Sequence, residues 1–319
     1  MKSMSSRAMA KSWPYTRYKN FEESLRVSAA NWFRANGSPT HPRMNYCLLS
    51  YDLWSQNIIC KDVADYIKQE KHRNLGKDSF PLHKYLHHGL SSQAMIFNLL
   101  GPLIVRDDVN ILKDSFQKVG IDWPDGEIET FFEHDDRLVF NEDSGQPTSI
   151  DALVSGEKGS IFIEAKLVEK EFGGCSVFAG GDCEGRNPYP DNLDSCYLHH
   201  IGRKYWTRLD ELGLSKSSFF RESICPFANY YQFFREVMFA FAKKGTFLLL
   251  YDARNPAFLR LHNNSQLQGG LWPFLEESIP KELRHLIGKI SIQTIVEAID
   301  GSGRHGDWIL NFRQKYGIQ

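Results

Sequence analysis

The segment at residues 148–167, TSIDALVSGEKGSIFIEAKL, constrains the fold of this chain more than any other. Two short apolar runs flank the turn sequence SGEKGS, which predicts a β-hairpin. Side chains of a strand alternate between its two faces, so Glu164 and Lys166 are expected on one face and Ala165 on the other. The hairpin brings Asp151 alongside the charged face.

Two carboxylates and an ammonium group therefore meet at one end of a mostly hydrophobic sheet. Such a group is costly to bury unless a cation and hydrogen bonds offset the cost. Two acids that hold a hard divalent metal, with a lysine near a water molecule, favour phosphodiester hydrolysis. The alternative is an edge hairpin on which Glu164 and Lys166 form a solvated ion pair of little energetic weight.

An Asp, a hairpin and then Glu-x-Lys resemble the signature of the PD-(D/E)XK nuclease superfamily, although Ile150 stands where the family has proline. Three further segments resemble standalone bacterial restriction endonucleases of that superfamily. They are SSQAMIFNLLGPL (91–103), FFEH (131–134) and YYQFFREVMFAFA (230–242). The resemblance implies an α/β fold with a restriction-endonuclease-like core, in which helices flank a mixed central sheet built in the order αβββαβ.

The same resemblance divides the chain into regions. We expect a basic aromatic arm (1–20), a helical N-terminal region (21–126), a nuclease core (127–255) with a cysteine-rich loop insertion (173–225), and a C-terminal α/β cap (256–319). Periodicity predicts helices at 21–36, 60–71, 89–104, 107–119, 227–243 and 307–316, and strands at 128–133, 137–140, 246–252 and 289–295. Gly101-Pro102 is expected to break the third helix.

The resemblance also implies the catalytic roles. Asp151 and Glu164 would hold Mg²⁺ or Mn²⁺, helped by the backbone carbonyl of Ala165. Lys166 would orient or deprotonate the attacking water, with a pKa that the metal and apolar walls lower. Glu133 is a candidate for a second metal or an outer position, with an ordinary surface carboxylate as the alternative.

Three further polar residues are candidates for places in or beside the site. Gln93 could orient a phosphate or a metal-bound water, or form a buried helix-capping or interhelix hydrogen bond. Glu169 could face the site or lie past the end of the strand. Gln232 resembles the polar residue that RecB-like nucleases place beside the active site, within otherwise core-forming aromatic residues.

Four of the six cysteines follow Lys166, namely Cys175, Cys183, Cys196 and Cys225. In a chain expected to be intracellular, they predict a metal site rather than disulfides, either a 4Fe–4S cluster or Zn²⁺, with unlinked thiols as the alternative. RecB-like nucleases with such a cluster take one cysteine from before the core, whereas here all four follow it and no C-x₂-C pair occurs. His199 and His200 could replace a thiolate at zinc.

Charge limits the partners that the chain can bind by electrostatics alone. The net charge is −1, so any DNA contact must use local patches such as the basic, aromatic first 20 residues. The alternative for these residues is a poorly ordered or surface-docked terminus. His83, His87 and His88 are expected on the surface or at a helix cap, although the H-x₃-H spacing would suit zinc on a helix. The longest apolar runs are too short to span a bilayer and no signal-peptide core is evident, so we expect a cytoplasmic protein.

These observations favour a Mg²⁺-dependent DNA endonuclease that could serve defence against foreign DNA, alone, as a homodimer or with a partner subunit. Two alternatives remain. One is a nuclease-fold protein that has lost activity and acts as a DNA-binding or assembly subunit. The other is a zinc-stapled protein that binds a partner through the cysteine-rich segment, in which the hairpin is incidental.

Overall fold

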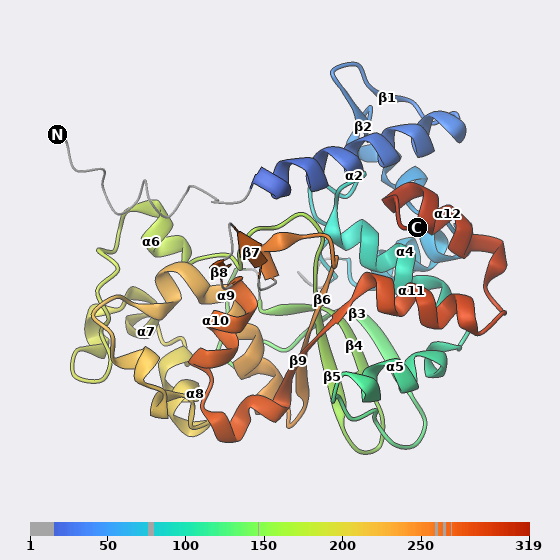
Figure 1. The fold of residues 1–319 in the computed structure, drawn as a ribbon. Helices are drawn as coiled ribbons and strands as arrows, with labels where there is room; N and C mark the ends of the chain where they lie inside the picture. Colours follow the sequence, from blue (N-terminus) through green and yellow to red (C-terminus); the bar gives the residue numbers. More distant parts are fainter. Residues whose placement is uncertain (1–15, 76–79, 146, 259–260, 264–265, 269) are drawn as a thin grey trace.

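A computed structural model describes residues 16–75, 80–145, 147–258, 261–263, 266–268 and 270–319 (Figure 1). Its centre is a mixed five-stranded sheet in the order β3-β4-β5-β6-β9. These strands are β3 (Glu129–Asp135), β4 (Ser149–Ser155), β5 (Ser160–Lys166), β6 (Thr246–Tyr251) and β9 (Ile287–Ser291). The first three are antiparallel neighbours, whereas β6 runs parallel to both β5 and β9. The expected α/β class with a mixed sheet between helices is confirmed.

Helices cover both faces of this sheet (Figure 1). The helices are α2 (Thr16–Ala35), α3 (Lys61–Arg73), α4 (Ser92–Val105), α5 (Lys113–Lys118), α6 (Ser176–Gly180), α7 (Tyr197–His200), α8 (Tyr205–Glu211), α9 (Pro226–Ala242), α10 (Leu271–Ser278), α11 (Ile292–Gly301) and α12 (Gly306–Tyr316). Short 3₁₀ helices are η1 (Tyr51–Asn57), η2 (Val109–Leu112), η3 (Leu193–Ser195), η4 (Leu214–Lys216), η5 (Ser218–Arg221), η6 (Pro256–Phe258) and η7 (Lys281–Leu286). Helices α3, α4, α11 and α12 pack on one face of the sheet, and α8, α9 and α10 on the other.

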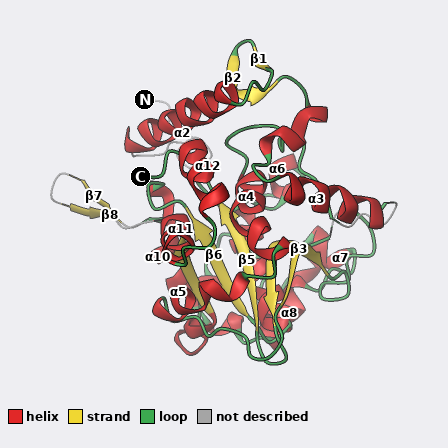
Figure 2. Cartoon of the chain, turned by 90° about the vertical axis from the view of Figure 1, so that its right-hand side faces the viewer, coloured by secondary structure: helices red, strands yellow, loops and turns green. Residues whose placement is uncertain are grey.

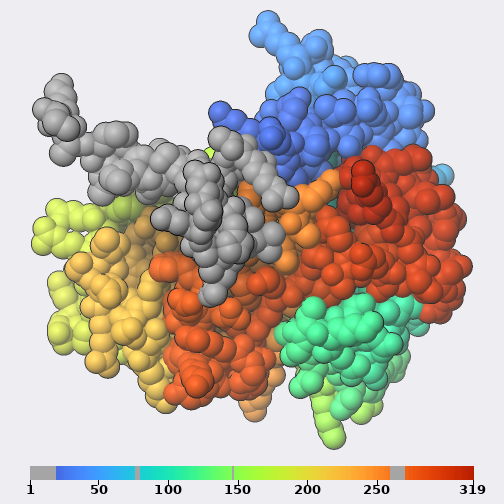
Figure 3. Space-filling view, in the orientation of Figure 1, coloured from blue at the N-terminus to red at the C-terminus, as the bar shows by residue number. Residues whose placement is uncertain are grey.

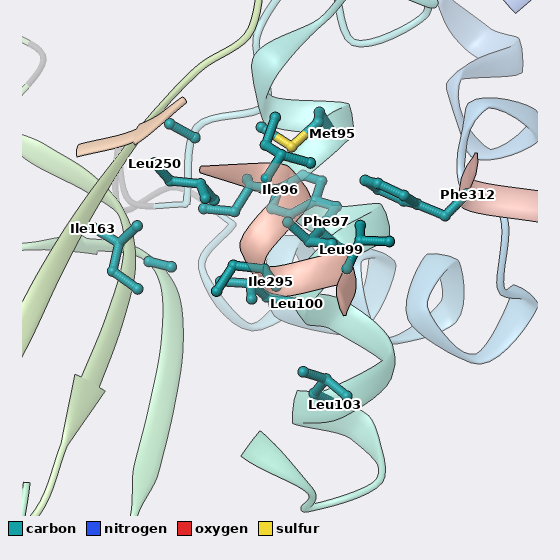
Figure 4. Packing of buried hydrophobic residues seen from close by; sticks show 14 of the residues in the cluster. Met95, Ile96, Phe97, Leu99, Leu100, Leu103, Ile163, Leu250, Ile295 and Phe312 are labelled. Atoms are coloured by element: carbon teal, nitrogen blue, oxygen red, sulfur yellow. The ribbon is translucent and has the colours of Figure 1, made fainter. Parts of the chain in front are cut away.

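The alternation of side chains along β5 separates two hydrophobic cores. Ile161 and Ile163 join the core shared with α4, whereas Phe162 joins the core shared with α9. Figure 4 shows Ile163 and Leu250 of the sheet facing the apolar side chains of α4, with Ile295 of α11 beside them. Burial of both faces of the sheet explains why the interior strand β6 is a continuous apolar run, TFLLLY.

Helix α4 packs on one face of the sheet and does not break at Gly101-Pro102, where the sequence predicts a break. The Ser91 side chain accepts a hydrogen bond from the amide of Ala94 and caps the helix, which continues through Pro102 to Val105. Close packing against α3 explains the glycine that precedes the proline. A Cβ atom on Gly101 would lie 2.5 Å from a methyl group of Val63, so a larger residue would displace that side chain.

Two predicted strands are also wrong in part. Residues 137–140 form a turn, because Asp136 accepts hydrogen bonds from the amide of Leu138 through its side chain and from that of Val139 through its carbonyl. Strand β9 ends at Ser291, whose hydroxyl accepts from the amide of Thr294 and begins α11. The segment predicted as one strand at 289–295 is therefore a strand end followed by a helix start.

The two ends of the described chain meet. Helix α2 packs against α12, and Figure 3 shows the blue N-terminal residues directly against the red C-terminal ones. The Arg254 guanidinium donates to the carbonyls of Tyr316 and Gly317 and fixes the end of α12. Two small hairpins lie outside the central sheet, β1 (Thr40–His41) with β2 (Met44–Leu48) and β7 (Leu261–Asn263) with β8 (Gln266–Gln268), the latter projecting at the left of Figure 2.

No helix within the described parts of the chain combines the length and the apolar character that a bilayer crossing requires.

Candidate active site

A cleft of about 820 Å³ opens at the C-terminal end of β5. Its walls come from α2, the segment 81–93, the sheet and α9. The cleft brings together all five side chains that the sequence predicts for catalysis, namely Gln93, Glu133, Asp151, Glu164 and Lys166. The expected convergence of two carboxylates and an ammonium group is therefore present in the structure.

Asp151 lies where strands β4 and β5 separate. The last registered pair of the two strands is Ala152 with Ile163. One residue further along, the Asp151 carboxylate takes over the role of a strand carbonyl and accepts the amide hydrogen of Ala165 at 2.8 Å. This bond holds Asp151 against the strand that carries Glu164.

Glu164, Lys166 and Gln232 form a closed triangle of hydrogen bonds. The Lys166 ammonium donates to Glu164 Oε1 at 2.5 Å and to Gln232 Oε1 at 3.0 Å. The Gln232 amide nitrogen in turn donates to Glu164 Oε1 at 2.7 Å. Glu164 and Lys166 are both buried, so the solvated surface pair that was the alternative interpretation is wrong.

The charges of the site shift its pKa values. Burial raises the pKa of the Asp151 carboxyl well above its ordinary value, and Glu164 and Glu133 raise it further. Burial alone would lower the pKa of Lys166, but Glu164, Glu236 and other acids outweigh that effect and raise it. Without a metal ion these side chains therefore favour the charged form of Lys166. The lowered pKa expected from the sequence concerns the metal-bound site and stays a prediction.

Glu133 belongs to a second hydrogen-bonded group in the cleft. Gln93 Nε2 donates to Glu133 Oε1 at 2.6 Å, and Ser149 donates to Oε2 at 3.0 Å. Burial raises the pKa of Glu133 to about 7, against the effect of these two donors. The backbone of Glu133 is strained, with a positive φ of 52°, between two registered pairs of β3 and β4. Strain of this kind is concentrated at functional sites.

Gln93 forms a polar bridge rather than an interhelix bond. In addition to Glu133, its amide nitrogen donates to the carbonyl of Pro81 at 2.8 Å, and its oxygen accepts from the amide of His83 at 2.8 Å. Gln93 thus fixes the segment 81–93 against β3 while lining the cleft.

Sequence reasoning missed Glu236, which is fully buried in the wall of the cleft. Both of its carboxylate oxygens have no hydrogen-bond partner within the described structure. Burial raises the pKa of Glu236 well above its ordinary value, and Glu164 adds to this effect. Glu236 follows Gln232 by four residues on α9, so the two share a helix face. That spacing in an otherwise aromatic helix was the available signal.

The remaining predicted residues take varied places. Glu169 lines the cleft and its side chain accepts the amide hydrogen of Leu167 at 2.7 Å, so it both faces the site and caps the strand end. His83 and His88 line the cleft, but the segment from Lys84 to His87 is a turn. The helical spacing that would suit zinc at His83 and His87 is therefore absent.

The donor set suits Mg²⁺, which prefers oxygen ligands and commonly uses one or two carboxylates with water and substrate oxygens. Asp151 and Glu164 would supply the carboxylates and Ala165 a backbone carbonyl. Within the residues that the structure describes, no three His, Cys, Asp or Glu side chains are placed to hold one ion by themselves. Waters and phosphate oxygens would therefore complete such a site.

The cysteines of the segment after Lys166 also converge, away from the cleft. Cys175, Cys183, Cys196 and Cys225 line one small cavity, whereas His199 and His200 are not among its lining residues. Most of the predicted basic arm, residues 1–15, lies outside the described residues.

Comparison with known proteins gives one match. The profile of a family described as "Restriction Endonuclease associating with ARP" matches residues 26–317. No curated protein and no solved structure matches the chain.

Proposed function

The chain belongs to the family of restriction endonucleases that associate with ARP, and on this premise we propose that it is a metal-dependent DNA endonuclease of the PD-(D/E)XK type. The observation that carries the proposal is the convergence of Asp151, Glu164 and Lys166 in one cleft, at the end of adjacent strands. The family match supports nuclease chemistry, and the residues of the cleft supply the groups that such chemistry requires.

In this proposal Asp151 and Glu164 hold the metal ion. The bound ion would polarise the scissile phosphate and lower the pKa of a water molecule. Because Asp151 is tied to the amide of Ala165 and Glu164 to Gln232, both carboxylates are positioned before substrate binds. Preorganised groups need little rearrangement when charge develops in the transition state.

Lys166 acts as a fixed positive charge. Its neighbours hold it protonated, so it is suited to donate hydrogen bonds to phosphate oxygens and offset the negative charge that builds on them. Gln232 keeps the ammonium in place through the 3.0 Å contact. We assign Gln232 to positioning and Lys166 to direct contact with the substrate.

A basic groove continues the cleft and gives the nucleic acid a path. A second cavity of about 420 Å³ lies between α2 and the β1–β2 hairpin and shares Arg26 and Tyr46 with the cleft. The guanidinium of Arg26 lies 5.2 Å from the centre of the Tyr46 ring. Arg34 and Arg43 extend the groove as exposed residues, and no ion pair engages either of them within the described chain. Phosphate contacts by arginine and stacking on tyrosine suit a DNA strand.

The family description supports two further parts of the proposal. An ARP partner would bind the nuclease, and the complex would restrict foreign DNA. These roles concern the assembly, so they are tested separately from cleavage by co-purification of the chain with an ARP protein.

Plasmid digestion with Mg²⁺ or Mn²⁺ tests the activity, using wild type, Asp151→Ala and Lys166→Ala. Metal-dependent nicking or linearisation that both variants lose is the expected result. Cleavage that survives in both well-folded variants would overturn the assignment of the site. If well-folded wild type binds DNA but does not cleave it, with or without the ARP partner, the protein is a nuclease-fold binding subunit instead.

A further inference from the structure

Four cysteines that are widely spaced in the sequence meet at one small cavity of about 30 Å³. Cys175, Cys183, Cys196 and Cys225 each come from a different loop or helix end. Apolar side chains supply most of the remaining wall, namely Val177, Phe178, Leu198 and Phe227. The other two cysteines of the chain, Cys47 and Cys60, do not line the cavity, and all six are free thiols.

Backbone amides point at the sulfur atoms. The amide of Gly185 donates to Cys183 Sγ at 3.3 Å. The amides of Phe227 and Ala228 donate hydrogen bonds to Cys225. Amide donors stabilise a thiolate, so the loops provide for negative charge on sulfur where an apolar wall alone would not.

Zinc does not fit this arrangement. Four thiolates around one zinc ion lie about 3.8 Å apart, because each Zn–S bond is about 2.3 Å long and the site is tetrahedral. In the part of the chain that the structure describes, no three Cys, His, Asp or Glu side chains are close enough to hold a single ion. The four cysteines nonetheless line one cavity, as a larger inorganic group bound by all four thiolates would require.

We propose that Cys175, Cys183, Cys196 and Cys225 bind a 4Fe–4S cluster through four thiolates. Each thiol gives up its proton when the cluster binds. The cluster is a structural group that joins loops with little regular structure of their own, since α6 and α7 contain only 5 and 4 residues. This inference does not depend on nuclease activity.

The cluster also fixes the helix that enters the active site. Cys225 immediately precedes α9, and the amide of Cys175 donates to the carbonyl of Phe227 in its first turn. Two residues before Cys175, the amide of Gly173 donates to Gln232 Oε1 at 3.2 Å, and Gly173 accepts the amide hydrogen of Gln232 at 2.9 Å. Loss of the cluster should therefore loosen the position of Gln232.

The test is anaerobic purification of the full chain with iron and acid-labile sulfide analysis, followed by reconstitution with ferrous iron and sulfide. About four irons and four sulfides per chain, with absorbance near 400 nm, are expected. Cys196→Ser should lose most of the absorbance, whereas Cys60→Ser, which changes a half-buried cysteine outside the cavity, should keep it.

One equivalent of zinc without iron would overturn the proposal, as would a chain that binds neither metal after reconstitution. A cluster of full intensity in Cys196→Ser would overturn the assignment of the ligands. If that variant does not fold, the iron and sulfide content of the wild type decides the matter alone. The cluster proposal and the nuclease proposal can be tested separately, because Asp151→Asn should retain the cluster absorbance and lose only cleavage.

Discussion

Asp151 accepts the amide hydrogen of Ala165 at 2.8 Å, at the point where the ladder between β4 and β5 has ended. The carboxylate thus satisfies a strand amide that would otherwise have no partner in the sheet. Its second oxygen remains available to the cleft. One side chain therefore serves the fold with one oxygen and the proposed metal site with the other, and the two roles can be separated by mutation.

Asp151→Asn should separate them. The asparagine oxygen can still accept the amide hydrogen of Ala165, so the thermal midpoint should remain within a few degrees of wild type. The negative charge is lost, and we expect Mg²⁺-dependent plasmid cleavage to fall by about 100-fold or more. Asp151→Ala should lose cleavage and also stability, because the Ala165 amide is left unpaired. Cleavage by Asp151→Asn at the wild-type rate would contradict a role as metal ligand.

Gln232→Leu tests the positioning of the charged pair. Without the amide, Lys166 loses an acceptor and Glu164 loses a donor. We expect cleavage to fall about 10- to 100-fold and the Mg²⁺ concentration for half-maximal rate to rise. Asn229→Ala, an exposed change on the same helix, is the control. A slower rate with an unchanged Mg²⁺ dependence would argue against positioning of Glu164.

Residues whose positions depend on local interactions were predicted from the sequence, whereas residues whose positions depend on distant parts of the chain were not. Asp151, Glu164 and Lys166 were found because strand alternation and a tight turn are local properties. Glu236 was missed because its exposure to the cleft depends on how α9 packs on the sheet. The close approach of α4 to α3 at Gly101 likewise depends on Val63, which lies in another helix.

The cysteine cavity shows the same limit. Sequence spacing predicted a metal site among the four thiols but could not show that they converge, since Cys175 and Cys225 meet through intervening loops. The antiparallel bridge between Arg186 and Ile224 and the bond from the Cys225 amide to the Gly185 carbonyl hold these loops together.

Glu236→Met should stabilise the metal-free protein. The wild-type carboxylate is buried with both oxygens unpartnered, and such a group costs roughly 1–3 kcal/mol. Its removal should raise the thermal midpoint in EDTA by about 2 °C or more. If Glu236 serves the metal or its waters, the same variant should show a smaller Mg²⁺-induced rise of the midpoint than wild type.

Met238→Leu, a conservative change of a buried residue on the same helix, is the matched control for this experiment. It should leave the response to Mg²⁺ unchanged. A Glu236→Met protein that is less stable than wild type in EDTA would show that the carboxylate has a stabilising partner after all.

Arg34→Ala combined with Arg43→Ala tests the groove as the path of DNA. Each lost phosphate contact should lower the slope of log affinity against log salt by about 1. Binding to a DNA duplex should therefore weaken and become less sensitive to salt, with cleavage at saturating DNA unchanged. Arg221→Ala removes an exposed arginine outside both cavities and should change neither property. Equal binding by the double variant and wild type would exclude this path.

Glu133→Gln should remove a pH dependence of stability. The folded pKa of Glu133 is about 7, above the ordinary value of 4.5, because the carboxyl is buried. Between these two values the folded chain binds the proton more readily than the unfolded chain, so stability falls as pH rises through the window. In EDTA, wild type and Glu133→Gln should have similar thermal midpoints at pH 5, where the carboxyl is protonated. At pH 8 the wild type carries a buried charge and should unfold at the lower temperature. A difference between the two proteins that is the same at both pH values would mean that Glu133 does not titrate in this range.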